Sequence, residues 1–317
     1  MQQDINILIK KIRNYDKKAI SRAMTFIEND MPFAQELMNR LHTYTGNAYR
    51  IGITGPPGSG KSTLTARLIK FYRNQSKSVG IVAIDPTSPF SGGAVLGDRI
   101  RMMEFANDSD VFIRSMASRG SLGGLSRKAQ EIADVFDASG KDIIIFETVG
   151  VGQTELDIAE TADTIVVVLV PESGDAIQTM KAGLMEIADI FVVNKSDREG
   201  AEKLKMELEM MLHLKSVNDS NWLPPIICTV ANQNKEIDTL KNKIDEHKEF
   251  LEKSGFLIDK RLKRTKGKVN EILQEKLLEK FWTPEKKVLF EEKIPQIINH
   301  KLSPYQLVKL LFGILKK

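Results

Sequence analysis

The sequence predicts an α/β fold in which a mostly parallel sheet is covered by helices, with helical extensions at both ends. Between residues 49 and about 231, short β-rich runs alternate with helical segments. Many of these runs are continuously apolar, which is typical of strands buried on both faces of a parallel sheet. A glycine-rich loop ending in Gly-Lys-Ser also lies between the first such run and a helical one. The runs are 51–54, 79–84, 111–113, 142–147, 164–170, 190–194 and 225–229.

The composition excludes several classes of protein. A chain of 317 residues can form one large α/β domain with appendages, and its net charge of +4 does not indicate a polyanionic partner. The single cysteine, Cys228, excludes an intramolecular disulfide and a cysteine-based zinc site. The charged N-terminus lacks the pattern of a signal peptide, and the longest apolar run is too short to span a bilayer. We expect a cytoplasmic protein without a nucleic-acid or membrane partner.

Three regions are expected along the chain. Residues 1–47 carry apolar side chains at helical spacing and form an N-terminal extension, which packs on the flank of the domain or against a partner. Residues 48–231 form the α/β domain. Residues 232–317 form a helical C-terminal extension, and such an arm favours a homodimer. Its basic run, 260–268, has no interleaved aromatic residues, so we interpret it as a solvated helix face rather than a nucleic-acid surface.

The glycine-rich loop matches the phosphate-binding pattern G-x-x-x-x-G-K-[ST], and it has the strand–loop–helix context that this pattern requires. Its glycines let successive backbone N–H groups point at phosphate oxygens, and the helix N-terminus adds positive potential. Lys61 would reach the β- and γ-phosphates, and the Ser62 hydroxyl would bind Mg²⁺. A chance Gly-rich turn is the alternative. The predicted phosphate-binding residues are Gly55, Pro56, Pro57, Gly58, Ser59, Gly60, Lys61, Ser62 and Thr63.

Carboxylates follow two of the apolar strands, at the edge of the sheet where ligands bind. Asp85 and Glu147 come directly after strands, and Asp98 lies in the loop beyond Asp85. A carboxylate there is costly unless it is paired or faces a cation, and Mg²⁺ prefers oxygen ligands. These three acids are therefore candidate Mg²⁺ ligands beside Ser62, with a helix cap or a surface salt bridge as the alternative. Gly150 lies in the loop after Glu147, a candidate switch that can contact a γ-phosphate.

Two later segments complete the candidate site. Asp175, Gln178 and Lys181 are polar at helical spacing, as expected of either a solvated helix face or a switch.

The second motif, Asn-Lys-x-Asp, follows the strand 190–194, and its order after the phosphate loop and strand-end acid is the guanine-nucleotide arrangement. Asp197 can accept from the N1–H and exocyclic amine of guanine, Asn194 would fix the base and its loop, and Lys195 would pack over the ring. Val230 or Ala231 could offer a backbone N–H to the base oxygen.

Taken together, these stretches resemble the MeaB/ArgK family, the methylmalonyl-CoA mutase-associated P-loop GTPases. The resemblance runs from about residue 17 to about residue 305, and the stretch DPTSPFSGGAVLGDRIRM is its most specific part. The chain departs from the family after its last nucleotide-binding strand, where residues 229–234 replace a Ser-Ala pair and a Gly-rich turn. The similar stretches are 22–29, 55–62, 85–102, 113–117, 147–155, 174–181 and 194–197.

The resemblance implies a homodimeric P-loop GTPase of the signal-recognition/MinD-like class that binds GTP or GDP with Mg²⁺. Family members act as G-protein chaperones of an adenosylcobalamin-dependent acyl-CoA mutase: they gate cofactor loading and protect the mutase. By the same resemblance, Ser62, Asp85, Asp98 and Glu147 form the Mg²⁺ set. Gly150 senses the γ-phosphate, and residues 175–181, including Lys181, form a switch that responds to the partner. Lys61, Asp85, Glu147, Gly150 and Lys181 are the candidate catalytic residues.

Two other functions stay open. One is a P-loop kinase linked to basic amino-acid transport, as the ArgK label suggests. The other is a metal-insertion or scaffold protein that uses nucleotide as an assembly signal, although one cysteine and four scattered histidines offer no metal cluster.

Overall fold

A parallel sheet forms the centre of the structure, a computed structural model that describes residues 2–86, 103–105, 107–118, 124–148, 158–173, 183–214 and 222–313. Within these residues, seven strands lie in the order β3-β2-β4-β1-β5-β6-β7, and each neighbouring pair is parallel. This confirms the predicted sheet. The strands are β1 (Tyr49–Thr54), β2 (Val79–Pro86), β3 (Val111–Ser118), β4 (Ile143–Thr148), β5 (Thr164–Leu169), β6 (Ile190–Asn194) and β7 (Ile226–Thr229).

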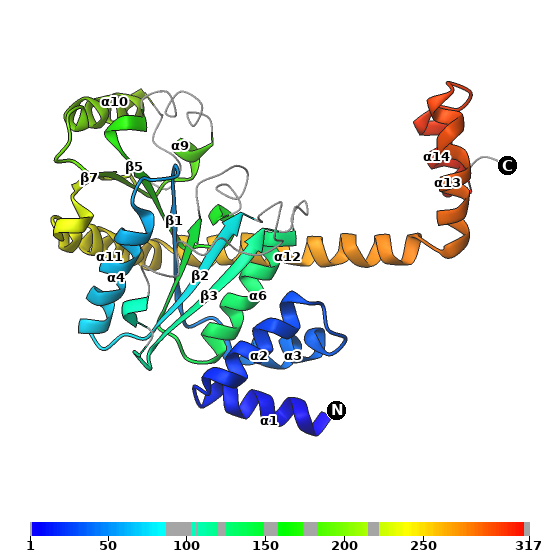
Figure 1. Cartoon of the computed structure of the whole chain (residues 1–317), viewed down its shortest axis with the longest axis horizontal. Helices are drawn as coiled ribbons and strands as arrows, with labels where there is room; N and C mark the ends of the chain where they lie inside the picture. The colour runs from blue at the N-terminus through cyan, green and yellow to red at the C-terminus, as the bar shows by residue number, and fades with distance from the viewer. Residues whose placement is uncertain are drawn as a thin grey trace. The chain divides into compact units, whose positions relative to one another are not determined.

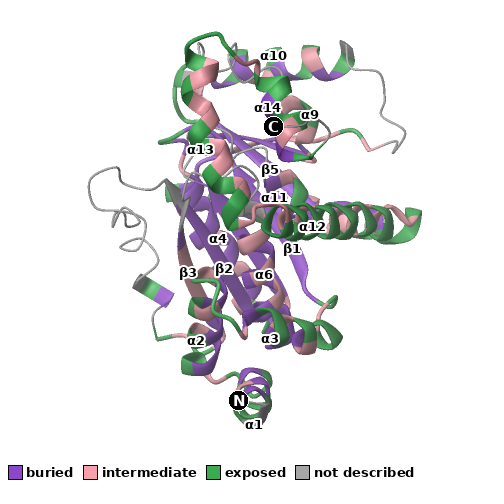
Figure 2. Cartoon of the chain, turned by 90° about the vertical axis from the view of Figure 1, so that its right-hand side faces the viewer, coloured by how far each residue is buried: buried purple, intermediate pink, exposed green. Residues whose placement is uncertain are grey.

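The central strands are buried along their whole length. Every residue of β1, β4, β5 and β6 is buried, which explains why these strands are continuous apolar runs in the sequence. Figure 2 shows the strands as buried ribbons between helices whose outer sides are exposed. Because all strands run in one direction, the loops that follow them meet at one edge of the sheet.

One face of the sheet is covered by α4 (Lys61–Asn74) and α11 (Ile237–Ser254), which pack against each other and against the strands. Leu64 and Leu68 of α4 share a hydrophobic cluster with Leu240 and Ile244 of α11. The helix α11 thus belongs to the core of the α/β unit, although it lies beyond the boundary at residue 231 expected from the sequence.

The opposite face is covered by α6 (Gly124–Ala138), on which the N-terminal helices pack (Figure 1). Ile20 and Met24 share one hydrophobic cluster with Phe136 of α6 and Phe146 of β4. The N-terminal extension therefore packs on the flank of the domain, one of the two alternatives that its sequence left open. These helices are α1 (Gln2–Arg13), α2 (Lys17–Glu28) and α3 (Ala34–Leu41).

The remaining elements of the α/β unit are short, except for α10 (Ala201–Leu214), which packs on β6 and β7. No helix in the described part of the chain has the length and hydrophobicity of a membrane span. The short elements are α9 (Leu184–Ile187) and the 3-10 helices η1 (His42–Tyr44), η2 (Met103–Phe105), η3 (Ile158–Glu160), η4 (Pro171–Ser173) and η5 (Ala231–Gln233).

The chain divides into two compact units after Arg264, within α12 (Phe256–Phe281). The second unit, 265–317, comprises the rest of α12, α13 (Pro284–Ile298) and α14 (Pro304–Leu311). An aromatic cluster holds it together, with the Phe281 and Phe312 ring centroids 4.6 Å apart. A capping box of Ser303 and Gln306 begins α14.

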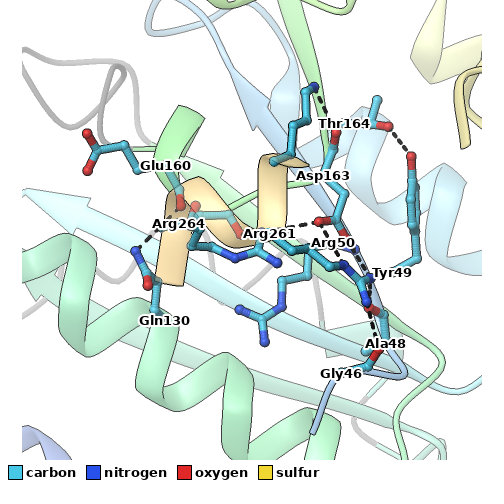
Figure 3. Close-up of polar contacts among 12 residues, drawn as sticks. Gly46, Ala48, Tyr49, Arg50, Gln130, Glu160, Asp163, Thr164, Arg261 and Arg264 are labelled. Carbon is cyan, nitrogen blue, oxygen red and sulfur yellow. Dashed lines mark hydrogen bonds and ion pairs between the residues drawn. The ribbon is translucent and has the colours of Figure 1, made fainter. Parts of the chain in front are cut away.

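The first turns of α12 are fastened to the α/β unit by buried ion pairs around Asp163 (Figure 3). One carboxylate oxygen of Asp163 accepts hydrogen bonds from the Arg50 backbone N–H and from Arg261, both at 3.1 Å. The other accepts from Arg264 at 3.2 Å. Burial alone would raise the pKa of Asp163, but the guanidinium groups of Arg264 and Arg261 outweigh it and lower that pKa.

The interpretation of 260–268 as a solvated helix face is therefore wrong for its first half. Besides its bonds to Asp163, Arg261 donates to the carbonyl oxygens of Gly46 and Ala48 at 2.7 and 3.0 Å. Lys260 contacts both carboxylate oxygens of Asp189 at 3.0 Å. These basic residues compensate the buried Asp163 and the largely buried Asp189, and their own side chains are only partly exposed.

Candidate functional site

The glycine-rich loop lies where β1 passes into α4, and its shape depends on two of its glycines. Gly55 has φ +137°, and a Cβ there would lie 2.1 Å from the carbonyl oxygen of Val168. Gly60 has φ +90°, and a Cβ there would lie 2.3 Å from Nδ2 of Asn194. Side chains at these positions would strain the backbone and collide with β5 or with the Asn-Lys-x-Asp motif. The two glycines therefore permit close packing of the phosphate loop against β5 and against the Asn-Lys-x-Asp motif.

Lys61 and Ser62 begin α4 directly after this loop, and both side chains are buried. The Lys61 ammonium group donates to the carbonyl oxygens of Gly55 and Pro56, each at 2.8 Å. The first hydrogen bond of the α4 ladder runs from Leu64 N–H to Gly60 O at 2.9 Å, so the amides before it lie at the helix end. A buried cation, a hydroxyl and a helix N-terminus together form an anion-binding environment.

Glu147 lies beside this environment, near the end of β4. It is in register with Ile53 of β1 on one side and with Ala83 of β2 on the other, and its side chain is 5% exposed. A hydrogen bond of 3.0 Å between the hydroxyls of Thr54 and Thr148 joins the ends of β1 and β4. A buried carboxylate at the edge that carries Ser62 is the kind of oxygen donor that Mg²⁺ takes, so these two residues fit the predicted ion.

Several predicted residues lie wholly or partly outside the described chain. The backbone of Asp85, the second-last residue of β2, is in register with Ala117 and lies two positions beyond the partner of Glu147, but its side chain is not among those described. Asp98, Gly150 and Lys181 fall outside the described residues. Their proposed roles rest on the sequence.

Asn194 connects the phosphate loop to the loop after β7. Its amide group donates to the carbonyl oxygen of Ser59 at 2.8 Å. Its carbonyl oxygen accepts from the Thr229 hydroxyl and from the Ala231 backbone N–H, both at 3.1 Å. The side chain is 3% exposed, so these bonds are shielded from water. Through these three hydrogen bonds Asn194 would fix its own loop, as the sequence predicts.

The loops around Asn194 place the other predicted base-binding residues. Lys195 adopts a left-handed conformation with φ +56°, and Asp197 is exposed. The Val230 N–H donates to Lys235 O at 3.3 Å, and that of Ala231 is bound to Asn194. Both amides proposed for the base oxygen thus make hydrogen bonds within the protein.

Sequence reasoning missed Arg67, which supports the same loop from α4. Its guanidinium group donates to the carbonyl oxygens of Ala231 and Asn232 at 3.1 and 3.2 Å. The sequence around Arg67 gives no sign of this contact, because an arginine two turns into a helix is usually solvated. Its partner Ala231 lies 164 positions away in the chain. Arg67 and Asn194 together hold the phosphate loop, α4 and the loop after β7 as one assembly.

The fold and this site define a P-loop nucleotide-binding protein with a guanine-type motif on a parallel sheet. The family described as Methylmalonyl Co-A mutase-associated GTPase MeaB matches residues 20–286. The chain belongs to this family, as its sequence motifs predict, and it is a GTPase.

Comparisons with individual proteins agree with this family. A GTPase of Pyrococcus abyssi is 50% identical over 309 residues, which cover 97% of this chain and 95% of that protein. GTPase ArgK of Escherichia coli is 32% identical over 304 residues, which cover 93% of this chain and 92% of that protein. The crystal structure of an LAO/AO transport system kinase superposes with a TM-score of 0.76 at 26% identity, covering 99% and 98% of the two chains.

Proposed function

We propose that this GTPase is a G-protein chaperone of an adenosylcobalamin-dependent acyl-CoA mutase. Nucleotide binding is supported by the two hydrogen bonds that join the Asn194 side chain to Ser59 and Ala231. They connect the phosphate loop and the Asn-Lys-x-Asp motif to the loop after β7. The mutase part is supported by the description of the family, which names a mutase-associated GTPase. In this role the protein gates loading of the mutase cofactor and protects the mutase from inactivation.

In the proposed site, Ser62 and Glu147 would hold Mg²⁺ together with Asp85 and Asp98, and the bound ion would supply positive charge beside the phosphates. Lys61 binds the β- and γ-phosphates, and the amides at the start of α4 orient them for attack by water. Asp197 selects guanine, Gly150 contacts the γ-phosphate, and Lys181 belongs to a switch that responds to the mutase. Catalysis by such a set is mostly positioning and charge stabilisation, so a partner that orders the switches would accelerate it.

We further propose that the protein acts in the cytoplasm as a homodimer formed through its second compact unit. Along α12, Val269, Leu273 and Leu277 stand four residues apart, and each is more than half exposed. This spacing places them on one face of the helix, as in helices that pair with a second copy. Mass measurement in solution, with Leu273→Glu as the variant, tests the interface.

The test of the main proposal is GTP hydrolysis with and without an adenosylcobalamin-dependent mutase from the same organism, together with detection of their complex. We expect slow turnover by the protein alone and clear stimulation by the mutase. Asn194→Ala should weaken GTP binding by at least about tenfold, because it leaves buried polar groups unpaired. Asn74→Ala, at the exposed end of α4, is the matched control. Tight GTP binding with neither complex nor stimulation would remove the mutase from the proposal.

A kinase activity is the second candidate, because the solved relative with a TM-score of 0.76 is titled a transport system kinase. A kinase would pass the γ-phosphate to an acceptor, whereas a GTPase releases it as inorganic phosphate. Phosphorus NMR of a reaction with GTP or ATP and a basic amino acid distinguishes the two. We expect inorganic phosphate from GTP and no phosphorylated amino acid.

A further inference from the structure

A pocket of about 490 Å³ opens at the edge of the sheet opposite the nucleotide site. Its lining includes residues 141–143, which lead into β4, and Lys77, which precedes β2. The phosphate loop and Asn194 instead follow the carboxyl ends of strands. A six-residue strand spans roughly 20 Å, so the pocket and the nucleotide site are separated by the length of the strands. Its volume lies within the range of sites for small molecules.

The lining of this pocket is positively charged. Arg13 of α1, Lys77, Lys141 and Lys248 of α11 all contribute to it. Arg13 stacks on Tyr44, with its guanidinium carbon 4.1 Å from the ring centroid, and Lys248 lies 5.3 Å from the ring centroid of Tyr49. Four cations converge here from segments far apart in the sequence.

The two acids in the lining are already compensated by donors of the protein itself. Asp137 is 2% exposed, and its oxygens accept the backbone N–H groups of Gly46, Asn47 and Ala48 at 2.8 to 3.1 Å. Asp142 accepts from the backbone N–H and the hydroxyl of Ser78 at 2.8 and 2.9 Å, and it forms an ion pair of 3.4 Å with Lys77. Asp142 thus compensates Lys77, but the lining holds four cations against two acids and keeps an excess of positive charge.

Lys141 contributes the most deeply buried of these charges. Its side chain is 3% exposed, and its ammonium group donates to Asp110 O at 2.9 Å and lies 5.5 Å from the ring centroid of Tyr15. Burial lowers its pKa to about 8. A cation in such a place raises the local potential, and an anion bound nearby would stabilise its charged form.

Tyr15 forms an aromatic wall of the pocket and is held there against its backbone preference. It lies two residues after the end of α1, with φ +60° at the position that usually carries glycine, and the Asp16 N–H donates to Lys11 O at 3.0 Å. Its hydroxyl donates to Gly140 O at 3.2 Å. Since a tyrosine in this conformation is uncommon, its side-chain contacts offset the strain. Tyr15 is 50% exposed and Tyr44 is 36% exposed, so both rings retain surface for a ligand.

We propose that this pocket binds a small organic phosphate with a planar ring, separately from the nucleotide in the phosphate loop. Arg13 and Lys248 bind the phosphate oxygens, as arginine and lysine do in charge-assisted hydrogen bonds. Tyr15 or Tyr44 stacks on the ring. The cations of the lining thus match the phosphate of such a ligand, and the tyrosines match its ring.

The test uses the full chain saturated with GDP and Mg²⁺, so that the phosphate loop is already filled. Calorimetric titration with AMP as the probe should show one further site, with inorganic phosphate and adenosine each binding more weakly. The variant Arg13→Gln with Lys248→Gln should weaken AMP binding by at least about tenfold, because charged hydrogen bonds are lost. Tyr15→Gly removes the aromatic wall and relieves the backbone strain, so it should weaken AMP while the protein stays folded.

The matched control is Lys11→Gln with Lys253→Gln, which makes the same charge change on α1 and α11 at exposed positions outside the pocket. This control should bind AMP as the wild type does. The proposal is overturned if GDP-saturated protein shows no AMP binding at about 1 mM, the concentration of a weak site. It is also overturned if the pocket variant and the control weaken AMP equally, since that result indicates non-specific attraction to surface charge.

Discussion

Replacing His247 by glutamine should make the stability of the protein less sensitive to acid. His247 is 1% exposed on α11, its Nδ1 lies 2.8 Å from the Thr164 hydroxyl, and its Nε2 lies 3.4 Å from Asp189. Burial lowers its pKa from 6.5 to about 4, although the carboxylate of Asp189 opposes this shift. The imidazole is thus held neutral at neutral pH.

The sign of the effect follows from proton binding in the two states. Below pH 6.5 the unfolded chain protonates this histidine, whereas the folded chain resists protonation until about pH 4. Protons therefore favour the unfolded state within this window. The stabilisation is complete above pH 6.5 and is lost progressively toward pH 4, with a total on the order of 3 kcal/mol from His247 alone.

The assay is urea unfolding at several pH values between about 7 and 4.5, without nucleotide, in the wild type and His247→Gln. Trp222, whose ring centroid is 4.7 Å from that of His247, reports on this region by fluorescence. The variant will be less stable at neutral pH, because it loses packing and a buried hydrogen bond, but its pH dependence will be flatter. His300→Gln, at an exposed position, should keep the wild-type slope. Equal slopes for the wild type and His247→Gln would refute the reasoning.

Two further substitutions test the ion pairs and the phosphate loop. Asp163→Asn should lower the free energy of unfolding by about 3–5 kcal/mol, because it leaves buried arginines without their acid, and thermal unfolding measures it; a loss as small as that of a surface substitution would contradict the network. Gly60→Ala should abolish tight GTP binding in a folded protein, because its Cβ would collide with Asn194 at 2.3 Å and its φ is +90°. Gly255→Ala has a similar φ of +81° in open space and separates backbone strain from this collision, so it should retain GTP binding in the same fluorescence titration.

The sheet and the nucleotide motifs could be predicted because their signals are local. Runs such as 165–169 are apolar without interruption, and the positions of Lys61 and Asn194 follow from motifs within a few residues of strands. Of the residues that bind the Asn194 side chain, Ser59 lies in the phosphate-loop motif, whereas Thr229 and Ala231 lie at the end of β7 and just after it. Ser59, however, is 135 positions away from Asn194, so the sequence suggests the role and the structure supplies the contact.

Features that depend on distant pairs escaped prediction. In the sequence of its own helix, Arg261 looks like a solvated basic residue. Its contact with Asp163, which lies 98 positions earlier in the chain, is visible only in the structure. The extension over 232–317 was predicted to be helical, but α13, which contains Pro295, was not predicted as a separate helix. The cationic pocket joins five segments of the chain, none of which forms a motif alone.

The position of Asn194 has a consequence for how new base preferences can arise. Both ends of its amide bind other parts of the protein, so Asn194 sustains the architecture of the site, whereas the exposed Asp197 is the residue that we propose to read the base. Rigidity and discrimination are therefore assigned to different residues of one tetrapeptide. Such a division of labour lets a substitution at Asp197 redirect the choice of base while the phosphate loop keeps its shape, so specificity can evolve without the cost of rebuilding the catalytic centre.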